Sequence, residues 1–396
     1  MPAHQADTPA DTSFQTTNVA VISTGHAIHD TYSGFLPSLV PVFIQNLALT
    51  RTEAGFLAAM LRVPSILQPI FGRIADKKDL RWLVIAAPAL TAVLMSLLGI
   101  APGYGVLVIL LLAAGLSSAA FHSVAPVIAG RLSGSKLGRG MGFWMVGGEF
   151  GRALGPIFIV TAIRFLGLKG TPWLMLFGIA ASLALFLRLR SIPVILAEKG
   201  DGLNWREAVR SMLPIQIPVL MLFASTSLLR TSLGIFLPTL LTEQGSGLWL
   251  AGAALTIYEA AGVIGALVGG NLSDRIGRSR MLALFQLLAP AGLLLFLRTA
   301  DELQLVLLIV LGFCSLAGLP ILMALIQESF PEKRSFANGF YMAGNFIVSF
   351  SAALLIGWLG DSIGLERAFF WSAILSLAGL PFILLLPKAK KSAEGS

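Results

Sequence analysis

Charged residues and cysteines are scarce in this sequence, and each shortage excludes a class of protein. Asp, Glu, Lys and Arg make up only 12% of the 396 residues, against about 25% in a soluble globular domain. Cys314 is the one cysteine, which excludes an internal disulfide and a cysteine-based metal cluster. Because 56% of the residues are hydrophobic, the composition indicates a protein built for a bilayer.

The motifs of common enzymes and pumps are missing as well. The sequence holds no HExxH pair, no GxSxG elbow in a strand–helix context and no GxxxxGK[ST] phosphate loop. We therefore expect neither an enzyme nor an ATP-driven pump, and no cofactor. Uphill transport by such a chain must draw on an ion gradient.

Apolar stretches long enough to cross a membrane recur along the whole chain, since a spanning helix needs about 20 mostly apolar residues. Twelve of them are present: 19–45, 52–75, 82–101, 105–131, 139–165, 172–190, 214–241, 249–270, 280–298, 303–327, 334–359 and 366–387. They predict an all-α membrane protein with twelve transmembrane helices.

The second half of the chain repeats the first. GRIAD (72–76) matches GNLSD (270–274), GFWMVGG (142–148) matches GFYMAGN (339–345), and FLPSL (35–39) matches FLPTL (236–240). These matches predict two pseudo-symmetric six-helix bundles, with a substrate site between them near the middle of the membrane. We expect a disordered N-terminus (1–18), a first bundle (19–190), a cytoplasmic linker (191–213), a second bundle (214–387) and a tail (388–396).

The basic residues predict the orientation. With the N-terminus inside, the inner loops and termini hold 20 of the 28 Lys and Arg residues, and the outer loops hold only five. Because basic loops stay cytoplasmic, we expect both termini in the cytoplasm. The net charge of +8 then reflects topology, so we expect no nucleic-acid partner.

Two loops carry the first family resemblance. GRIADKKDLRW (72–82) and GNLSDRIGRSR (270–280) resemble the loop signature of the major facilitator superfamily. The resemblance implies gating roles, with loop aspartates that latch one access state by charge or by helix capping; the alternative is a pair of solvated turns that only fix topology. The residues concerned are Gly72, Asp76, Gly270, Asp274, Arg275, Gly277 and Arg278.

A third motif, GEFGRALGP (148–156), resembles the fifth-helix motif of proton-coupled drug antiporters. Gly147, Gly151 and Gly155 recur every four residues and predict a flat face for close helix packing, and Pro156 predicts a bend. GHAIHD (25–30) and FHSVAP (121–126) further resemble the fosmidomycin-resistance family of efflux proteins. Here His29, Ser123 and Glu149 replace residues of that family's pattern, which leaves the transported drug open.

Polar groups inside the predicted helices mark the candidate site. His26 and Asp30 share one stripe of the first helix, with His29 at its edge. Asp30 and Arg62 lie at similar depth, so we expect them to pair, either as a static pair or around a carboxylate that titrates during transport. Glu149 and Arg152, three residues apart, share a helix face and predict a second pair. The proton-coupling candidates are Asp30, Glu149 and Glu259, and the substrate-binding candidates are His26, His29, Arg62, His122, Arg152, Arg230 and Asn345.

The polar residues favour transport of an anion, because the arginine fork suits carboxylate, phosphate or phosphonate groups. We expect a monomeric, multi-pass inner-membrane antiporter that exports a small anionic compound or drug in exchange for protons. An importer or symporter of an organic acid is the alternative. A divalent-metal exporter that uses His26, His29, Asp30 and His122 as ligands is a third reading.

Overall fold

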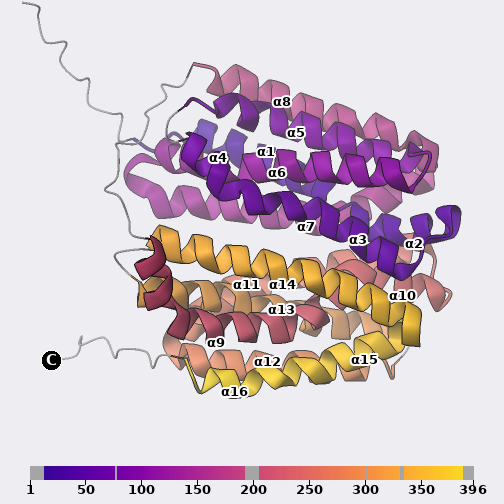
Figure 1. Ribbon diagram of the computed structural model, residues 1–396. Coiled ribbons are helices and arrows are strands. Elements are labelled where there is room, and N and C mark those ends of the chain that lie inside the picture. Colours follow the sequence, from indigo (N-terminus) through magenta and orange to yellow (C-terminus); the bar gives the residue numbers. More distant parts are fainter. Residues whose placement is uncertain (1–12, 76–77, 192–204, 300–301, 331–333, 387–396) are drawn as a thin grey trace, which may run out of the picture.

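The computed structural model describes residues 13–75, 78–191, 205–299, 302–330 and 334–386, and these ranges contain helices and no strand. The first bundle holds α1 (Thr16–Ser33), α2 (Leu36–Leu47), α3 (Arg51–Arg62), α4 (Gln68–Ala75), α5 (Arg81–Ser96), α6 (Tyr104–Leu132), α7 (Leu137–Leu166) and α8 (Met175–Leu189). The second holds α9 (Trp205–Thr231), α10 (Leu237–Glu243), α11 (Leu248–Ile276), α12 (Arg278–Phe296), α13 (Glu302–Ser329), α14 (Arg334–Ile363), α15 (Leu365–Ser376) and α16 (Leu380–Ile383). Figure 1 shows the two bundles side by side.

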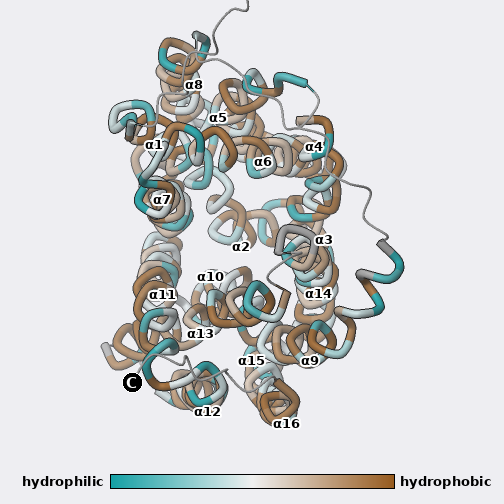
Figure 2. Tube along the Cα trace, turned by 90° about the vertical axis from the view of Figure 1, so that its left-hand side faces the viewer, coloured by the Kyte–Doolittle hydropathy of each residue, from teal (hydrophilic) through white to brown (hydrophobic). Residues whose placement is uncertain are grey.

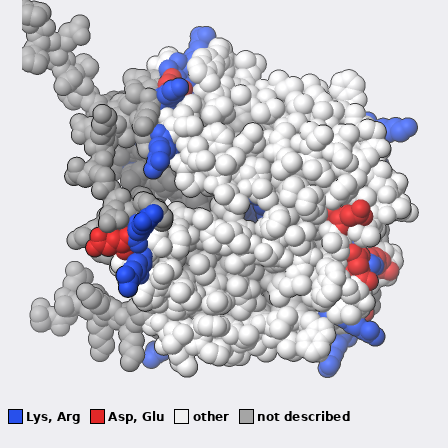
Figure 3. Space-filling model, viewed as in Figure 1, with Lys and Arg blue, Asp and Glu red and all other residues white. Residues whose placement is uncertain are grey.

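The expectation of an all-α membrane protein is confirmed. Eleven helical segments in the described ranges are long and apolar enough to span a bilayer. The twelfth expected span, 19–45, is divided at Gly34 and Phe35 into α1 and α2. Figure 3 shows one face of the surface that a bilayer needs: charged side chains gather at the two ends, and the band between them is uncharged except for one recessed basic patch near the middle.

The expected linker and tails fall mostly outside the described residues. Of 191–213, residues 192–204 are not described, and α9 already begins at Trp205. The expected disordered N-terminus is described only from Ser13, and α1 begins at Thr16. The tail at 388–396 lies wholly outside the described residues.

Contacts between the bundles repeat with the same offset as the sequence. A side chain at Gly55 of α3 would collide with the carbonyl of Ala353 in α14, and one at Gly252 of α11 would meet the carbonyl of Pro156 in α7. Gly55 and Gly252 are 197 positions apart, as are Pro156 and Ala353. Figure 2 shows these two seams, α7 against α11 and α3 against α14, on opposite sides of the molecule.

Two ion pairs between the bundles, both made by Arg51, lie at the end away from the termini. Arg51 at the start of α3 binds Glu243 of α10 at 2.7 Å, and its backbone N–H donates to Asp361 of α14 at 2.8 Å. At the other end, glycines on two of the same seam helices have open space: no atom lies within 4 Å of a side chain built at Gly142 of α7 or at Gly339 of α14. Among the described residues, the bundles are therefore joined by ion pairs and a backbone hydrogen bond at the Arg51 end.

Candidate transport site and histidine cluster

The leading helix of each bundle is broken at the same repeat position. α1 gives way to α2 at Gly34 and Phe35, and α9 gives way to α10 through a wide turn at Ser232–Phe236. Both breaks come directly before the repeated FLPSL and FLPTL segments. Corresponding interrupted helices in two repeats mark the binding region of many transporters, so the breaks locate the candidate site near them.

Asp30 lies among three histidines on the side of α1 that faces α6. Its carboxylate is 3.4 Å from His26 Nε2, 2.9 Å from His29 Nδ1 and 3.4 Å from His122 Nε2. His26 Nε2 and His122 Nε2 are 3.2 Å apart. His26, His29 and Asp30 are buried, whereas the His122 side chain is 30% exposed. We call His26, His29, Asp30 and His122 the histidine cluster.

Fixed partners orient every ring of the cluster. His26 Nδ1 bonds the backbone carbonyl of Trp144 at 2.9 Å, and the His26 ring stacks on the Trp144 indole. His122 Nδ1 bonds the carbonyl of Ser118 at 2.9 Å. His29 Nε2 bonds the Thr91 hydroxyl at 3.1 Å, and its ring stacks on Phe121. The cluster is therefore a preorganised polar site inside one bundle.

The expected Asp30–Arg62 pair is wrong for this state. The ion-pair partners of Asp30 are the three histidines, and Arg62 is exposed at the end of α3. Arg62 interacts electrostatically with Arg152 and Glu259 instead. Similar depth along the membrane normal was a poor guide, because the Asp30 carboxylate lies among histidines of α1 and α6, while Arg62 lies exposed at the end of α3.

A charged network joins the bundles between α7 and α11. As their spacing predicts, Arg152 pairs with Glu149 in α7, and Arg152 Nε also lies 3.7 Å from Glu259 Oε2 in α11. Arg62 and Glu259 occupy repeat-equivalent positions 197 apart and carry opposite charges. The internal repeat thus brings a cation and an anion to the seam between the bundles. We call Glu149, Arg152 and Glu259 the interbundle bridge.

The glycine stripe of α7 lies against α1. Side chains built at Gly147, Gly151 and Gly155 would collide with the backbone carbonyls of Ser23, Ala27 and Thr31, which also recur every four residues. Such close contact needs glycine on one partner. Pro156, next to the stripe, is buried within α7. This packing fixes α7, and with it Glu149 and Arg152, against the helix that carries the histidine cluster.

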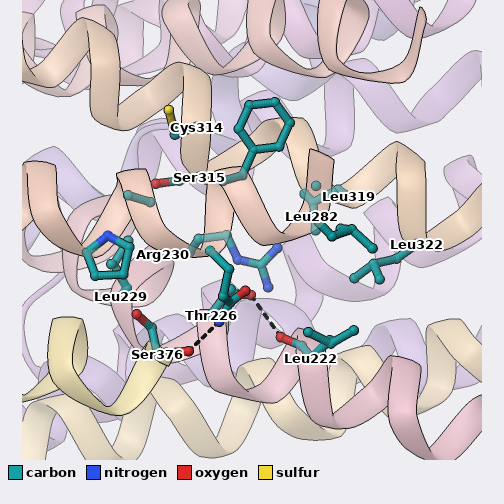
Figure 4. Close-up of a pocket in the computed structure, with 15 residues that line it drawn as sticks. Leu222, Thr226, Leu229, Arg230, Leu282, Cys314, Ser315, Leu319, Leu322 and Ser376 are labelled. Atoms are coloured by element: carbon teal, nitrogen blue, oxygen red, sulfur yellow. Dashed lines mark hydrogen bonds between the residues drawn. The ribbon is translucent and has the colours of Figure 1, made fainter. Parts of the chain in front are cut away.

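Arg230 lines a small cavity inside the second bundle, between α9, α12, α13 and α15 (Figure 4). The cavity has a volume of about 30 Å³, room for one or two water molecules. The guanidinium lies over the Phe223 ring, 4.3 Å from its centre, and Nε is buried without a hydrogen-bond partner. The buried Asn345 Oδ1 also has no partner. Arg230 Nε thus keeps capacity for a ligand, but Asn345 does not line this cavity, and the cavity is too small for a drug.

A larger cavity, of about 800 Å³, lies between α1, α7 and α8. Its lining is apolar apart from threonines and Tyr32, and it includes none of the candidate site residues. The polar site therefore lies elsewhere on α1 and α7.

The loop motifs contribute contacts within one bundle. Arg278 binds both Asp274 and Glu328 of α13, and Gly277 ends α11 with φ of +106°, a conformation that favours glycine. Among the described residues, a side chain built at Gly72 of α4 would meet no atom within 4 Å, and one at Gly270 would meet only Pro320 at 4.0 Å. Arg275 is exposed, and Asp76 lies outside the described residues. The ion pairs of the second loop stay within the second bundle, so the latching role of the loops remains a prediction.

Two features of the site were not predicted. The Trp144 carbonyl and ring hold His26 across 118 positions of sequence, and no local pattern signals such a contact. The repeat-equivalent placement of two opposite charges, Arg62 and Glu259, could have been predicted. The offset of 197 residues between GFWMVGG and GFYMAGN aligns these two positions directly.

Comparisons with known proteins agree with this architecture. The chain is 24% identical over 97% of its length to the fosmidomycin resistance protein of Escherichia coli (strain K12), of which it covers 95%. It is 25% identical to the multidrug resistance protein MdtG of Rahnella sp. (strain Y9602), with 87% of each chain covered. A crystal structure of a bacterial homolog of the human lysosomal transporter Spinster superposes with a TM-score of 0.78 at 12% identity, covering 94% of this chain and 97% of that one.

The family model described as Major Facilitator Superfamily matches residues 22–253 and 219–396. The chain is a multi-pass membrane transporter, not an enzyme, and belongs to the Major Facilitator Superfamily.

Proposed function

We propose that the chain exports a small anionic compound, of the kind represented by fosmidomycin, in exchange for protons. The observation that carries the proposal is the interbundle bridge, in which Arg152 of one bundle is held by Glu149 and by Glu259 of the other. Arg62 lies close enough to act on Arg152 and Glu259 electrostatically. Two arginines at the seam form a receptor for an anion.

The bridge can be broken in two ways. An anion that binds Arg152 and Arg62 replaces Glu259 as the partner of Arg152. A proton on Glu259 removes the charge that attracts Arg152. Each event weakens a contact between the bundles, so each ligand shifts the population toward another access state. If the anion drives the movement in one direction and the proton drives the return, the result is antiport.

Electrostatics also favours a second candidate. A bound anion and a proton on Glu259 attract each other, so the two can bind together, which is the thermodynamic requirement of a symporter. The organic-acid symporter therefore stays as the alternative. The names of two relatives, a fosmidomycin resistance protein and a multidrug resistance protein, support export.

We infer that the chain lies in the inner (plasma) membrane as a monomer with both termini in the cytoplasm. The bias of Lys and Arg toward the terminal end supports this orientation. On this assignment the Arg51 end faces outward, and the histidine cluster and the bridge lie inward of it.

The test uses inside-out membrane vesicles whose lumen is acidified by respiration. Fosmidomycin and a panel of small organic anions are added, and the pH of the lumen is followed for wild type, Arg152→Gln and, as a control, Arg164→Gln, which is outside the bridge. We expect the lumen to become alkaline in wild type and in the control. In Arg152→Gln the half-maximal substrate concentration should rise about 10–100-fold, because hydrogen bonds to charged groups contribute about 1.5–3 kcal/mol.

Two results would contradict the proposal. Further acidification of the lumen on substrate addition would make the chain a symporter. An identical change of lumen pH in Arg152→Gln and wild type would show that the interbundle bridge does not bind the substrate.

A further inference from the structure

We propose that the histidine cluster binds one divalent transition-metal ion of the zinc class, with His26 Nε2, His122 Nε2 and one carboxylate oxygen of Asp30 as ligands. These ligand atoms come from α1 and α6 of the first bundle, and they all lie within 4.8 Å of one another. The site is separate from the interbundle bridge, so this inference does not depend on the proposed function.

The separations between the ligand atoms fit a tetrahedral ion. Bonds of about 2.0–2.1 Å place neighbouring ligands of a tetrahedral zinc about 3.3–3.4 Å apart. The observed separations are 3.2 Å between the two Nε2 atoms, 3.4 Å from His26 Nε2 to Asp30 Oδ2 and 3.4 Å from His122 Nε2 to Asp30 Oδ1. Direct charge-assisted hydrogen bonds from either ring to Asp30 would be about 2.7–2.9 Å long. Both contacts to Asp30 are longer than such bonds, and each uses a different carboxylate oxygen, so an ion between the rings can take either oxygen as its third ligand.

Backbone carbonyls fix the side of each ring that carries a hydrogen. Because a carbonyl only accepts, Trp144 and Ser118 require an N–H at Nδ1 of His26 and of His122. In the neutral rings, both Nε2 atoms then direct lone pairs toward the same gap and toward a carboxylate. Facing lone pairs repel unless a proton or a metal cation lies between them, and a carbonyl on the far ring nitrogen is the usual support of a metal-bound histidine.

His29 provides a second support. Its Nδ1 bonds Asp30 Oδ1 at 2.9 Å and its Nε2 bonds Thr91, so it holds the carboxylate in place without contributing a ligand. A carboxylate fixed in this way is typical of the outer shell of a metal site.

The surrounding charge permits a cation. Arg152 acts electrostatically on Asp30 and on His122, but its own charge is paired with Glu149 and Glu259. The ion can enter on the side of His122, the most exposed member of the cluster. Three protein ligands leave a fourth position for water or another small ligand.

The test titrates Zn²⁺ into the purified full-length protein in detergent, after treatment with a chelator, and follows heat by calorimetry. Co²⁺ then serves as a spectroscopic probe, because four-coordinate Co²⁺ absorbs visible light far more strongly than the six-coordinate aqueous ion. We expect one ion per chain and a strong visible band. His26→Gln, His122→Gln and Asp30→Asn should each weaken Zn²⁺ binding more than about 100-fold, and His29→Gln about 10–100-fold.

Glu366→Gln is the matched control, since it removes an exposed carboxylate at the start of α15, outside both the cluster and the interbundle bridge, and it should bind Zn²⁺ like wild type. Wild-type protein that binds no Zn²⁺, or a Co²⁺ spectrum like that of the aqueous ion, would overturn the proposal. So would Zn²⁺ binding that survives in all three ligand variants. Because the Co²⁺ spectrum is read on wild type, a variant that fails to fold does not remove the test.

Discussion

Asp361 at the end of α14 caps the helix that begins at Arg51 in the other bundle. Its two carboxylate oxygens accept the backbone N–H groups of Arg51 and Thr52, each at 2.8 Å, and the Thr52 hydroxyl at 2.6 Å. A carboxylate at a helix N-terminus stabilises unsatisfied donors and the helix dipole. Here the capped helix and the capping residue belong to different bundles, so the cap is also an interbundle lock.

Removal of the cap should open this end of the molecule. A negative charge at a helix N-terminus contributes about 0.3–2 kcal/mol, so Asp361→Asn should shift the population toward separation at the Arg51 end by about 2–30-fold. Spin labels on Lys169 and Arg298, in a Cys314→Ser background, should report a larger fraction of long distances by pulsed electron resonance. Asp79→Asn removes a carboxylate that pairs with Arg81 within one bundle, and it should leave the distribution unchanged. An unchanged distribution in Asp361→Asn would show that the cap does not hold this end closed.

The glycine stripe predicts a contrast between two alanine substitutions in α7. Gly151→Ala would drive a methyl group into the Ala27 carbonyl, whereas Gly142→Ala meets nothing within 4 Å. Overpacking costs about 1–3 kcal/mol, while alanine in an open helix position is favourable by up to about 1 kcal/mol. Thermal unfolding in detergent should show a lower midpoint for Gly151→Ala and an equal or higher one for Gly142→Ala. Equal midpoints below wild type would mean that the stripe does not set the packing.

Gly148 connects the same helix to the proposed metal site. A side chain at Gly148 would collide with the ring of His26, so Gly148→Ala should displace a metal ligand without changing its chemistry. We expect at least a tenfold loss of Zn²⁺ affinity and a weaker Co²⁺ band, with Gly142→Ala as the unaffected control. Full Zn²⁺ affinity in Gly148→Ala would argue that His26 is not a ligand.

The sequence predicts the fold better than the site, for a physical reason. Apolar length and the repeated segments such as FLPSL and FLPTL determine the number of helices and the two bundles, because the bilayer dictates both. The Glu149–Arg152 pair was predictable because it lies within one helix. The partners of Asp30 were not, since they depend on how α1 turns against α6 and α7, which is set by packing at Gly147, Gly151 and Gly155. The prediction that Asp30 pairs with Arg62 rested on their similar depth in the membrane, and it was wrong for this state.

The most direct test of the interbundle bridge measures Glu259→Gln in proteoliposomes. Two rates are compared with wild type: exchange of labelled fosmidomycin without any gradient, and its accumulation when a pH gradient is imposed at zero membrane potential. The account predicts that Glu259→Gln still exchanges fosmidomycin but no longer accumulates it, because the proton has lost the carboxylate through which it acts on Arg152. Accumulation at the wild-type level in Glu259→Gln would contradict the account.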